Sequence, residues 1–170
     1  IMKKLLKNAT VFTNGQFKKC DVEVINETIT NIESKIEGES FDVIYDLQNL
    51  YLLPGLIDVH THLREPGFIY KETIKTGSFA GAKGGYTSIA AMPNLNPTPD
   101  CYENLKLELE AIEKDAQINV YPYGTITKGE KGEELADFEQ MKDYVIAFSD
   151  DGRGVQSEEM MEHAMQEAKR

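Results

Sequence analysis

The sequence contains no tryptophan, only two cysteines and only three histidines among its 170 residues. The cysteines, Cys20 and Cys101, lie far apart and form no Cys-x-x-Cys spacing, which excludes a disulfide scaffold and favours reduced thiols. No apolar run reaches the roughly 18 residues of a membrane-spanning helix, and the first residues turn polar too soon for a signal peptide. We therefore expect a cytoplasmic protein.

Basic residues are also scarce. Lys and Arg number 18 against 29 Asp and Glu, which gives a formal net charge of -11. Domains that bind nucleic acids or anionic membranes present a basic surface, so we expect neither kind of partner. With 41% hydrophobic residues, the chain has the composition of an ordinary globular protein that can bury one core.

The first 54 residues have the pattern of short β-strands separated by turns. Apolar and alternating runs occur at residues 5–12, 20–25, 28–32 and 41–47. A turn signal, Asn14-Gly15, separates the first two runs, and residues 50–53 lead into Pro54-Gly55. We predict a small β-sheet segment over residues 1–54 and a domain junction at its end.

From residue 55 onwards, short apolar strands alternate with segments of helical periodicity, which is typical of βα units on a parallel sheet. The expected strands are 56–60, 86–92, 118–123 and 145–148. The expected helices are 71–83, 101–115 with Asp100 as its N-cap, 133–144, and one that begins after Ser157.

Four βα units over residues 55–170 amount to half of an eight-stranded barrel, which usually takes about 250 residues. The expected fold class is therefore α/β, the first half of a (β/α)8 TIM-like barrel preceded by a small β-rich segment. The chain looks truncated in this interpretation. A small open α/β domain that is complete as it stands fits the periodicity as well.

Two of the three histidines, His60 and His62, follow Asp58 at the end of the first expected barrel strand. Because side chains alternate along a strand, both imidazoles point to the same face and can ligate one metal ion there. The alternative is a pair of hydrogen-bonded core histidines. The loop that follows begins with Arg64, and active sites of barrels are built from such loops, which favours a metal site.

The end of the fourth strand carries two adjacent acids, Asp150 and Asp151, followed by Gly152. This pattern is also common where a turn enters a helix. On a parallel barrel, however, the ends of the first and fourth strands open onto the same face. One of the two carboxylates can therefore reach a metal ion held by the histidines.

Two further polar residues follow strand ends. Asn94 comes after the second strand, where it either begins a turn or contacts a ligand. Arg64 is either a solvated surface charge or a planar group that pairs with a substrate carboxylate.

Taken together, these motifs resemble the amidohydrolase superfamily and, within it, the bacterial dihydroorotases of the longer-chain type. The resemblance covers the whole chain and rests on 58–67 (Asp-Val-His-Thr-His-Leu-Arg-Glu-Pro-Gly), 71–73, 84–87, 92–94, 121–123 with 126–127, and 148–152. Arg64, Asn94 and the Asp-Asp-Gly sequence favour dihydroorotase over hydantoinase and allantoinase.

The resemblance implies a zinc site, with one or two ions, at the C-terminal mouth of the barrel. His60 and His62 are the implied zinc ligands, and Asp151 is the implied carboxylate ligand that can bridge two metals. Arg64 and Asn94, with His62 nearby, are implied to hold the substrate carboxylate. The implied reaction is the reversible cyclisation of N-carbamoyl-L-aspartate to L-dihydroorotate in pyrimidine biosynthesis.

Family members carry further metal-binding histidines and a proton-moving aspartate on later strands, which this chain does not contain. No catalytic residue is therefore expected within it, and we expect the chain alone to be inactive. The implied partners are the small-molecule substrate, the remainder of the barrel, a second copy in a homodimer, and aspartate carbamoyltransferase. The alternatives are a hydantoinase-like or allantoinase-like enzyme and a non-catalytic scaffold that binds aspartate carbamoyltransferase.

Overall fold

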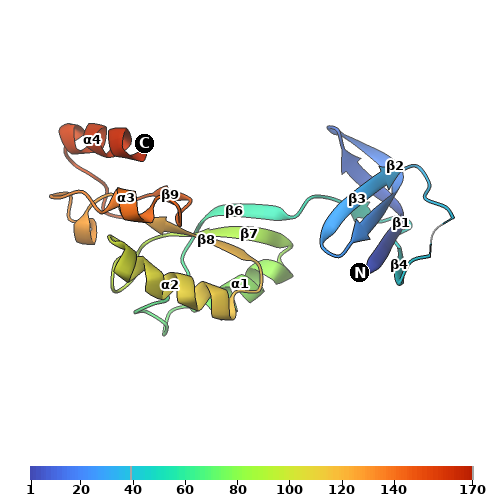
Figure 1. Cartoon of the computed structure of the whole chain (residues 1–170), viewed down its shortest axis with the longest axis horizontal. Coiled ribbons are helices and arrows are strands. Elements are labelled where there is room, and N and C mark those ends of the chain that lie inside the picture. Colours follow the sequence, from blue (N-terminus) through green and yellow to red (C-terminus); the bar gives the residue numbers. More distant parts are fainter. Residues whose placement is uncertain (39, 170) are drawn as a thin grey trace. The chain divides into compact units, whose positions relative to one another are not determined.

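The computed structural model describes residues 1–38 and 40–169. The chain divides into two compact units, Ile1–Pro54 and Gly55–Arg170, whose elements are labelled in Figure 1. Within the described residues, no helix has the length and apolar character needed to cross a membrane.

The first unit is a five-stranded sheet. Its strands are β1 (Lys3–Thr13), β2 (Gln16–Ile25), β3 (Thr28–Glu33), β4 (Val43–Asp46) and β5 (Tyr51–Leu52). Strands β1, β2 and β3 pair antiparallel in sequence, whereas β4 and β5 both pair with β1 in parallel. Ala9, Val11, Cys20 and Val22 form its buried core, so Cys20 is a structural thiol.

The second unit contains a four-stranded parallel sheet in the order β6-β7-β8-β9. The strands are β6 (Leu56–Thr61), β7 (Tyr86–Ala91), β8 (Asn119–Gly124) and β9 (Ala147–Phe148). The helices are α1 (Ile74–Lys83), α2 (Tyr102–Asp115), the 3-10 turn η1 (Lys128–Glu130), α3 (Phe138–Met141) and α4 (Glu158–Ala168). All four strands run in one direction, so the carboxyl ends of all four lie at the same end of the sheet.

Two apolar clusters hold this unit together. Helices α1 and α2 lie along the same side of the sheet (Figure 1), and Ile74 of α1 packs with Ile89 and Val120 of the strands. In the second cluster, Leu105 of α2 packs with residues of α3 and α4 that include Met141 and Ala164. The predicted half-barrel, with a β-rich segment before it, is confirmed.

Several details differ from the sequence prediction, among them the first helix, which begins at Ile74 and not at residue 71 because Thr73 is its N-cap. The helix expected at 133–144 is reduced to the four residues of α3, because Ala136 N donates to Ile126 O and residues 127 and 135 form a β-bridge. Strand β9 is shorter than the expected 145–148. The N-cap of α2 is Cys101, because the Asp100 carboxylate instead accepts hydrogen bonds from Asn104 and from Gly129 N.

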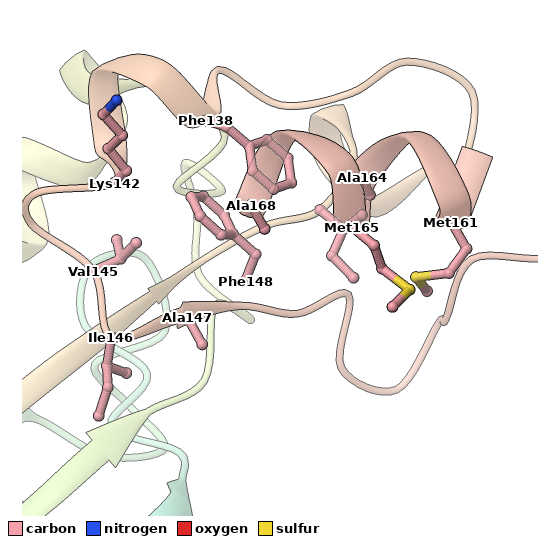
Figure 2. Close-up of a pocket in the computed structure, with 11 residues that line it drawn as sticks. Phe138, Lys142, Val145, Ile146, Ala147, Phe148, Met161, Ala164, Met165 and Ala168 are labelled. Carbon is pink, nitrogen blue, oxygen red and sulfur yellow. The ribbon is translucent and has the colours of Figure 1, made fainter. Parts of the chain in front are cut away.

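An apolar groove of about 410 Å³ lies between α3, β9 and α4 (Figure 2). The rings of Phe138 and Phe148 stack beside it, with centroids 3.9 Å apart. Lys142 is the one charged residue among those that line it, and none of the predicted site residues does so. Apart from Lys142, the groove therefore has no side chain that can transfer a proton, and the predicted site residues lie elsewhere, at the strand ends.

Candidate metal centre

The first strand of the parallel sheet presents the two histidines. His60 belongs to β6, and His62 follows the last residue of that strand. Their rings lie edge to face with centroids 5.3 Å apart. Asp58 Oδ1 accepts a hydrogen bond from His60 N at 3.0 Å, which fixes the backbone at this strand end.

Asp151 approaches the histidines from the last strand of the sheet, after β9. His60 Nε2 lies 3.4 Å from Asp151 Oδ1, and His62 Nε2 lies 3.6 Å from Asp151 Oδ2. In a flat sheet, three strand spacings of about 4.8 Å would separate β6 from β9 by roughly 14 Å. The strand ends therefore converge, and groups 89 or more positions apart in the sequence meet at one point.

The three side chains have the chemistry and spacing of a metal site. Each offers one ligand atom, and these atoms all lie within 4.8 Å of one another. Two ligands bound to one tetrahedral zinc ion at about 2.0 Å are roughly 3.3 Å apart, close to the measured nitrogen–oxygen distances. Imidazole nitrogens with a carboxylate oxygen suit a divalent metal such as zinc.

The electrostatics also suit metal binding. Burial and the charge of Arg64 lower the pKa of His62, and the opposing effect of Asp151 is smaller. A neutral imidazole has a free lone pair, which a metal ligand requires. The side chain of His60 is about half exposed, at 53%, so the alternative of two buried core histidines does not describe this pair.

The neighbouring acid, Asp150, has a different environment. It is 3% exposed, and its carboxylate accepts hydrogen bonds from Ile126 N, Thr127 N and the Thr127 hydroxyl. Asp150 therefore anchors the loop after β8, while Asp151 faces the histidines.

A pocket of about 490 Å³ opens beside the metal-ligand candidates. Its walls include His62, Asp151, Arg64, Asn94, Glu130 and Arg153. The volume falls within the usual range for small-molecule sites. The structure thus brings Arg64, which follows β6, and Asn94, which follows β7, into one pocket with His62.

Backbone strain marks the same pocket. Six described residues other than glycine have positive φ, and four of them are asparagines, which tolerate this conformation. The other two are Arg64, at φ 61°, and Glu130, at φ 57°, and both line the pocket. Strained residues of this kind gather at functional sites, where they cost about 1–3 kcal/mol each.

Asn94 bridges the ends of two strands. Its Nδ2 donates to the main-chain oxygen of Asp151 at 2.8 Å and to Glu130 Oε1 at 3.1 Å. An amide NH2 group has two hydrogens, so both are engaged in this arrangement. The predicted role of Asn94 as a donor to a substrate carboxylate needs one of these bonds to be exchanged.

The pocket also contains two residues that the sequence pattern did not indicate, Glu130 and Arg153. Arg153 Nε lies 3.6 Å from Glu130 Oε2. Burial, followed by the nearby Asp150, raises the pKa of Glu130, and Arg153 and Asn94 oppose this shift. Glu130 is the last residue of the 3-10 turn η1 and Arg153 lies in the turn after β9, and segments this short carry no periodicity signal. The two glycines at positions 129 and 132 are a turn signal next to Glu130 but give no indication of a site.

The fold matches that of a solved barrel enzyme. The L-hydantoinase (dihydropyrimidinase) from Arthrobacter aurescens aligns with 98% of this chain at a TM-score of 0.84, with 18% identity, over 38% of its own length. The chain thus has the fold of the matching part of this enzyme. A family model described as "Dihydro-orotase-like" matches residues 50–170, and the chain belongs to this family.

Curated relatives agree with this assignment. A dihydroorotase from Fusobacterium nucleatum is 48% identical over 161 residues, and one from Geobacillus kaustophilus is 47% identical over 167 residues. These alignments cover 95% and 96% of this chain but only 38% and 39% of the relatives. The chain therefore spans less than two fifths of the length of these relatives.

Proposed function

We propose that the protein to which this chain belongs is a zinc-dependent dihydroorotase. It interconverts N-carbamoyl-L-aspartate and L-dihydroorotate, a step in the biosynthesis of pyrimidines. The observation that carries the proposal is the position of Arg64, which lines the same pocket as the candidate metal ligands His62 and Asp151. A substrate with a carboxylate next to a reacting amide needs a cation beside the metal.

In this proposal His60, His62 and Asp151 would hold the zinc, as one ion or two. Their ligand atoms and spacing fit zinc, as described above. When bound, the ion supplies Lewis acidity, which activates water near neutral pH and polarises a carbonyl group.

The protein side chains orient the substrate. The planar guanidinium of Arg64 can form two parallel hydrogen bonds with the substrate carboxylate, which fixes both its position and its angle. His62 lies beside this group, and Asn94 completes the wall, with the exchange of a hydrogen bond noted above. When the substrate carboxylate is fixed in this way, the ureido group or ring amide of the substrate lies on the metal side of the pocket. This orientation lowers the entropic cost of the reaction.

The test of the function is the Arg64→Ala variant of the whole protein. We expect wild-type protein with zinc to catalyse both directions of the reaction. Removing the guanidinium should lower kcat/KM for dihydroorotate by at least 100-fold, because a charge-assisted bidentate contact is lost. Arg64→Lys should retain an intermediate activity, because the charge stays while the fork geometry is lost.

Hydantoin, which lacks the carboxylate, is the matched control substrate. If the wild-type protein hydrolyses hydantoin but not dihydroorotate, it is a hydantoinase-like enzyme and the proposal is wrong. If Arg64→Ala keeps full dihydroorotate turnover, the role of Arg64 as a carboxylate clamp is wrong. No turnover of any cyclic amide, combined with binding to aspartate carbamoyltransferase, would favour the scaffold alternative.

We also propose a cytoplasmic location and a homodimer, with aspartate carbamoyltransferase as a further partner. Family resemblance is the support for these points. Sedimentation of the purified protein, alone and mixed with aspartate carbamoyltransferase, tests both associations.

A further inference from the structure

Two polar atoms next to the candidate metal centre are buried and lack a partner. They are His62 Nδ1 and Asn94 Oδ1; among the residues that the structure describes, the others are the two oxygens of Glu108 in α2. A buried polar group without a hydrogen bond costs about 1–3 kcal/mol. Two such groups on neighbouring side chains of one pocket therefore call for a physical explanation.

The chemistry of the two atoms is complementary. The other ring nitrogen of His62, Nε2, faces Asp151 at 3.6 Å and is the one available to a metal. The two unpaired atoms belong to side chains that line the same pocket. A carbonyl oxygen can only accept, and a neutral imidazole carries one N–H.

We propose that His62 Nδ1–H donates to Asn94 Oδ1, and that Glu130 is the positioning residue that keeps Asn94 turned this way. The bond places the His62 proton on Nδ1 and leaves the lone pair of Nε2 for the metal, as partners behind a metal ligand commonly do. This inference deepens the proposed function, because it rests on His62 being a metal ligand.

Glu130 is the group that decides the orientation of Asn94. Its carboxylate oxygen and the Asp151 carbonyl oxygen are both acceptors, so the amide nitrogen of Asn94 has to face them. The amide oxygen is thereby turned away from both of these acceptors, and it is buried without a partner among the described residues. Without Glu130, the main-chain oxygen of Asp151 alone would hold the amide.

Glu130 is itself held firmly. It is 9% exposed, and Arg153 Nε lies 3.6 Å from its second oxygen. The preceding residue, Gly129, donates its N–H to Asp100 Oδ2 at 2.9 Å, which ties the turn to the start of α2. A carboxylate fixed in this way, on a left-handed backbone, is suited to orient another side chain.

The first experiment measures the tautomer of His62 in the metal-free whole protein at pH 8. Histidine-selective 15N labelling reports which ring nitrogen carries the proton, and a His62→Gln variant assigns the signal. We expect the Nδ1–H form in the wild type and a mixture, or the Nε2–H form, in Glu130→Ala. Glu130→Gln keeps an oxygen that can accept from Asn94 and should restore the Nδ1–H form.

Glu134→Ala is the matched control, since Glu134 is an exposed acid of the same loop, paired with Lys128. It should leave the tautomer of His62 unchanged. Arg153→Ala should also leave it unchanged, because the largely exposed Arg153 pairs with Glu130 Oε2, whereas Asn94 donates to Glu130 Oε1. If Arg153→Ala shifts the His62 tautomer as Glu130→Ala does, and Glu130→Gln does not restore the Nδ1–H form, the ion pair between Arg153 and Glu130 controls the tautomer. The proposed role of Glu130 is then wrong.

The second experiment is a double-mutant cycle on zinc affinity, measured by competition with a chelator. We expect Glu130→Ala and Asn94→Ala each to weaken zinc binding about ten-fold. Since both act through one hydrogen bond to His62, the double variant should lose no more than Asn94→Ala alone. Additive losses would contradict the inference.

The two proposals fail in different ways. If the wild-type protein shows the Nδ1–H tautomer and its loss in Glu130→Ala but catalyses no dihydroorotate turnover, the function is wrong and the positioning role stands. If it turns over dihydroorotate but metal-free His62 carries its proton on Nε2, the positioning role is overturned and the function stands.

Discussion

At the scale of single residues, the fold buries an acid that the candidate site does not use. Glu108 of α2 is 1% exposed, and neither carboxylate oxygen has a partner within the described residues. Burial raises the pKa of Glu108 well above its usual value of 4.5. The folded protein therefore favours the neutral acid, and ionising this group works against folding.

This environment predicts a pH-dependent stability. Below about pH 4.5 Glu108 is protonated in both the folded and the unfolded state, so its contribution to stability is fully present. As the pH rises through the raised folded pKa, the unfolded state is favoured and that contribution is lost. Glu108→Leu should remove this slope and raise the free energy of unfolding at pH 8 by about 2 kcal/mol.

The measurement is urea unfolding of the whole protein at several pH values between 5 and 8. Glu110→Leu is the control, because Glu110 lies on the same helix with its side chain 61% exposed. This control should keep the pH slope of the wild type. An unchanged slope in Glu108→Leu would show that Glu108 is ionised or paired in the whole protein.

The two adjacent acids after β9 should have different roles: Asp150 in the stability of the fold and Asp151 in metal binding. Asp150→Asn should lower the free energy of unfolding by about 2 kcal/mol, because the buried carboxylate that accepts hydrogen bonds from Ile126 and Thr127 becomes an amide. Asp151→Asn should leave stability without metal nearly unchanged and weaken zinc binding at least ten-fold. Calorimetric unfolding and zinc titration of both variants check this, and equal effects of the two changes on both quantities would contradict it.

Residues of the candidate site differ in how well the sequence predicts them. His60 and His62 could be predicted to share a face because strand alternation fixes their direction locally. Asp151 could be predicted to join them because parallel strands end at one edge. Glu130 could not be predicted, since its place in the pocket depends on a strained turn that Asp100 holds from 29 positions away.

At the scale of elements, local pattern and tertiary contacts compete. The amphipathic pattern at 133–144 predicts one helix, and Phe138 and Met141 are indeed buried on one face. The first residues of that segment instead pair with the loop after β8, which is the loop that Asp150 anchors. A helix there would break those hydrogen bonds, so a contact formed by distant residues overrides the local preference.

The loop between β6 and α1 depends on a glycine. Gly67 has φ +96°, and a Cβ atom there would lie 2.3 Å from Asn96 O and 2.8 Å from Asn96 N. Gly67→Ala should therefore displace the loop that begins with Arg64. We expect KM for dihydroorotate to rise at least ten-fold, because a small misplacement of an orienting group is costly.

Gly85→Ala is the matched control for that change. Gly85 also has positive φ, at +85°, but a Cβ atom there meets nothing within 4 Å. It should lose about 1–2 kcal/mol of stability for the left-handed backbone and keep KM. A normal KM in Gly67→Ala would show that Arg64 is positioned independently of this loop.

At the scale of the whole molecule, the half-barrel was predictable because βα alternation specifies a parallel sheet. What alternation does not specify is how the sheet closes. β6 and β9 are its two edges, and several β6 side chains are exposed, among them Ile57 at 67% and Val59 at 60%. The His60, His62 and Asp151 cluster joins the ends of those two edge strands.

A metal bound by that cluster should therefore stabilise the protein as a whole. At a free zinc concentration 1,000 times its Kd, binding to the folded state alone adds about 4 kcal/mol to the free energy of unfolding. Removing zinc with a chelator should lower the Tm of the whole protein by several degrees, and added zinc should restore it. Mg²⁺ should not restore the Tm, because it prefers an octahedral shell of oxygen ligands. Asp151→Asn is the control and should gain less from zinc than the wild type, because a site about ten-fold weaker adds only about 2.7 kcal/mol at the same free zinc concentration. If the Tm of zinc-loaded wild-type protein does not change when the chelator removes the metal, zinc does not connect the edge strands β6 and β9.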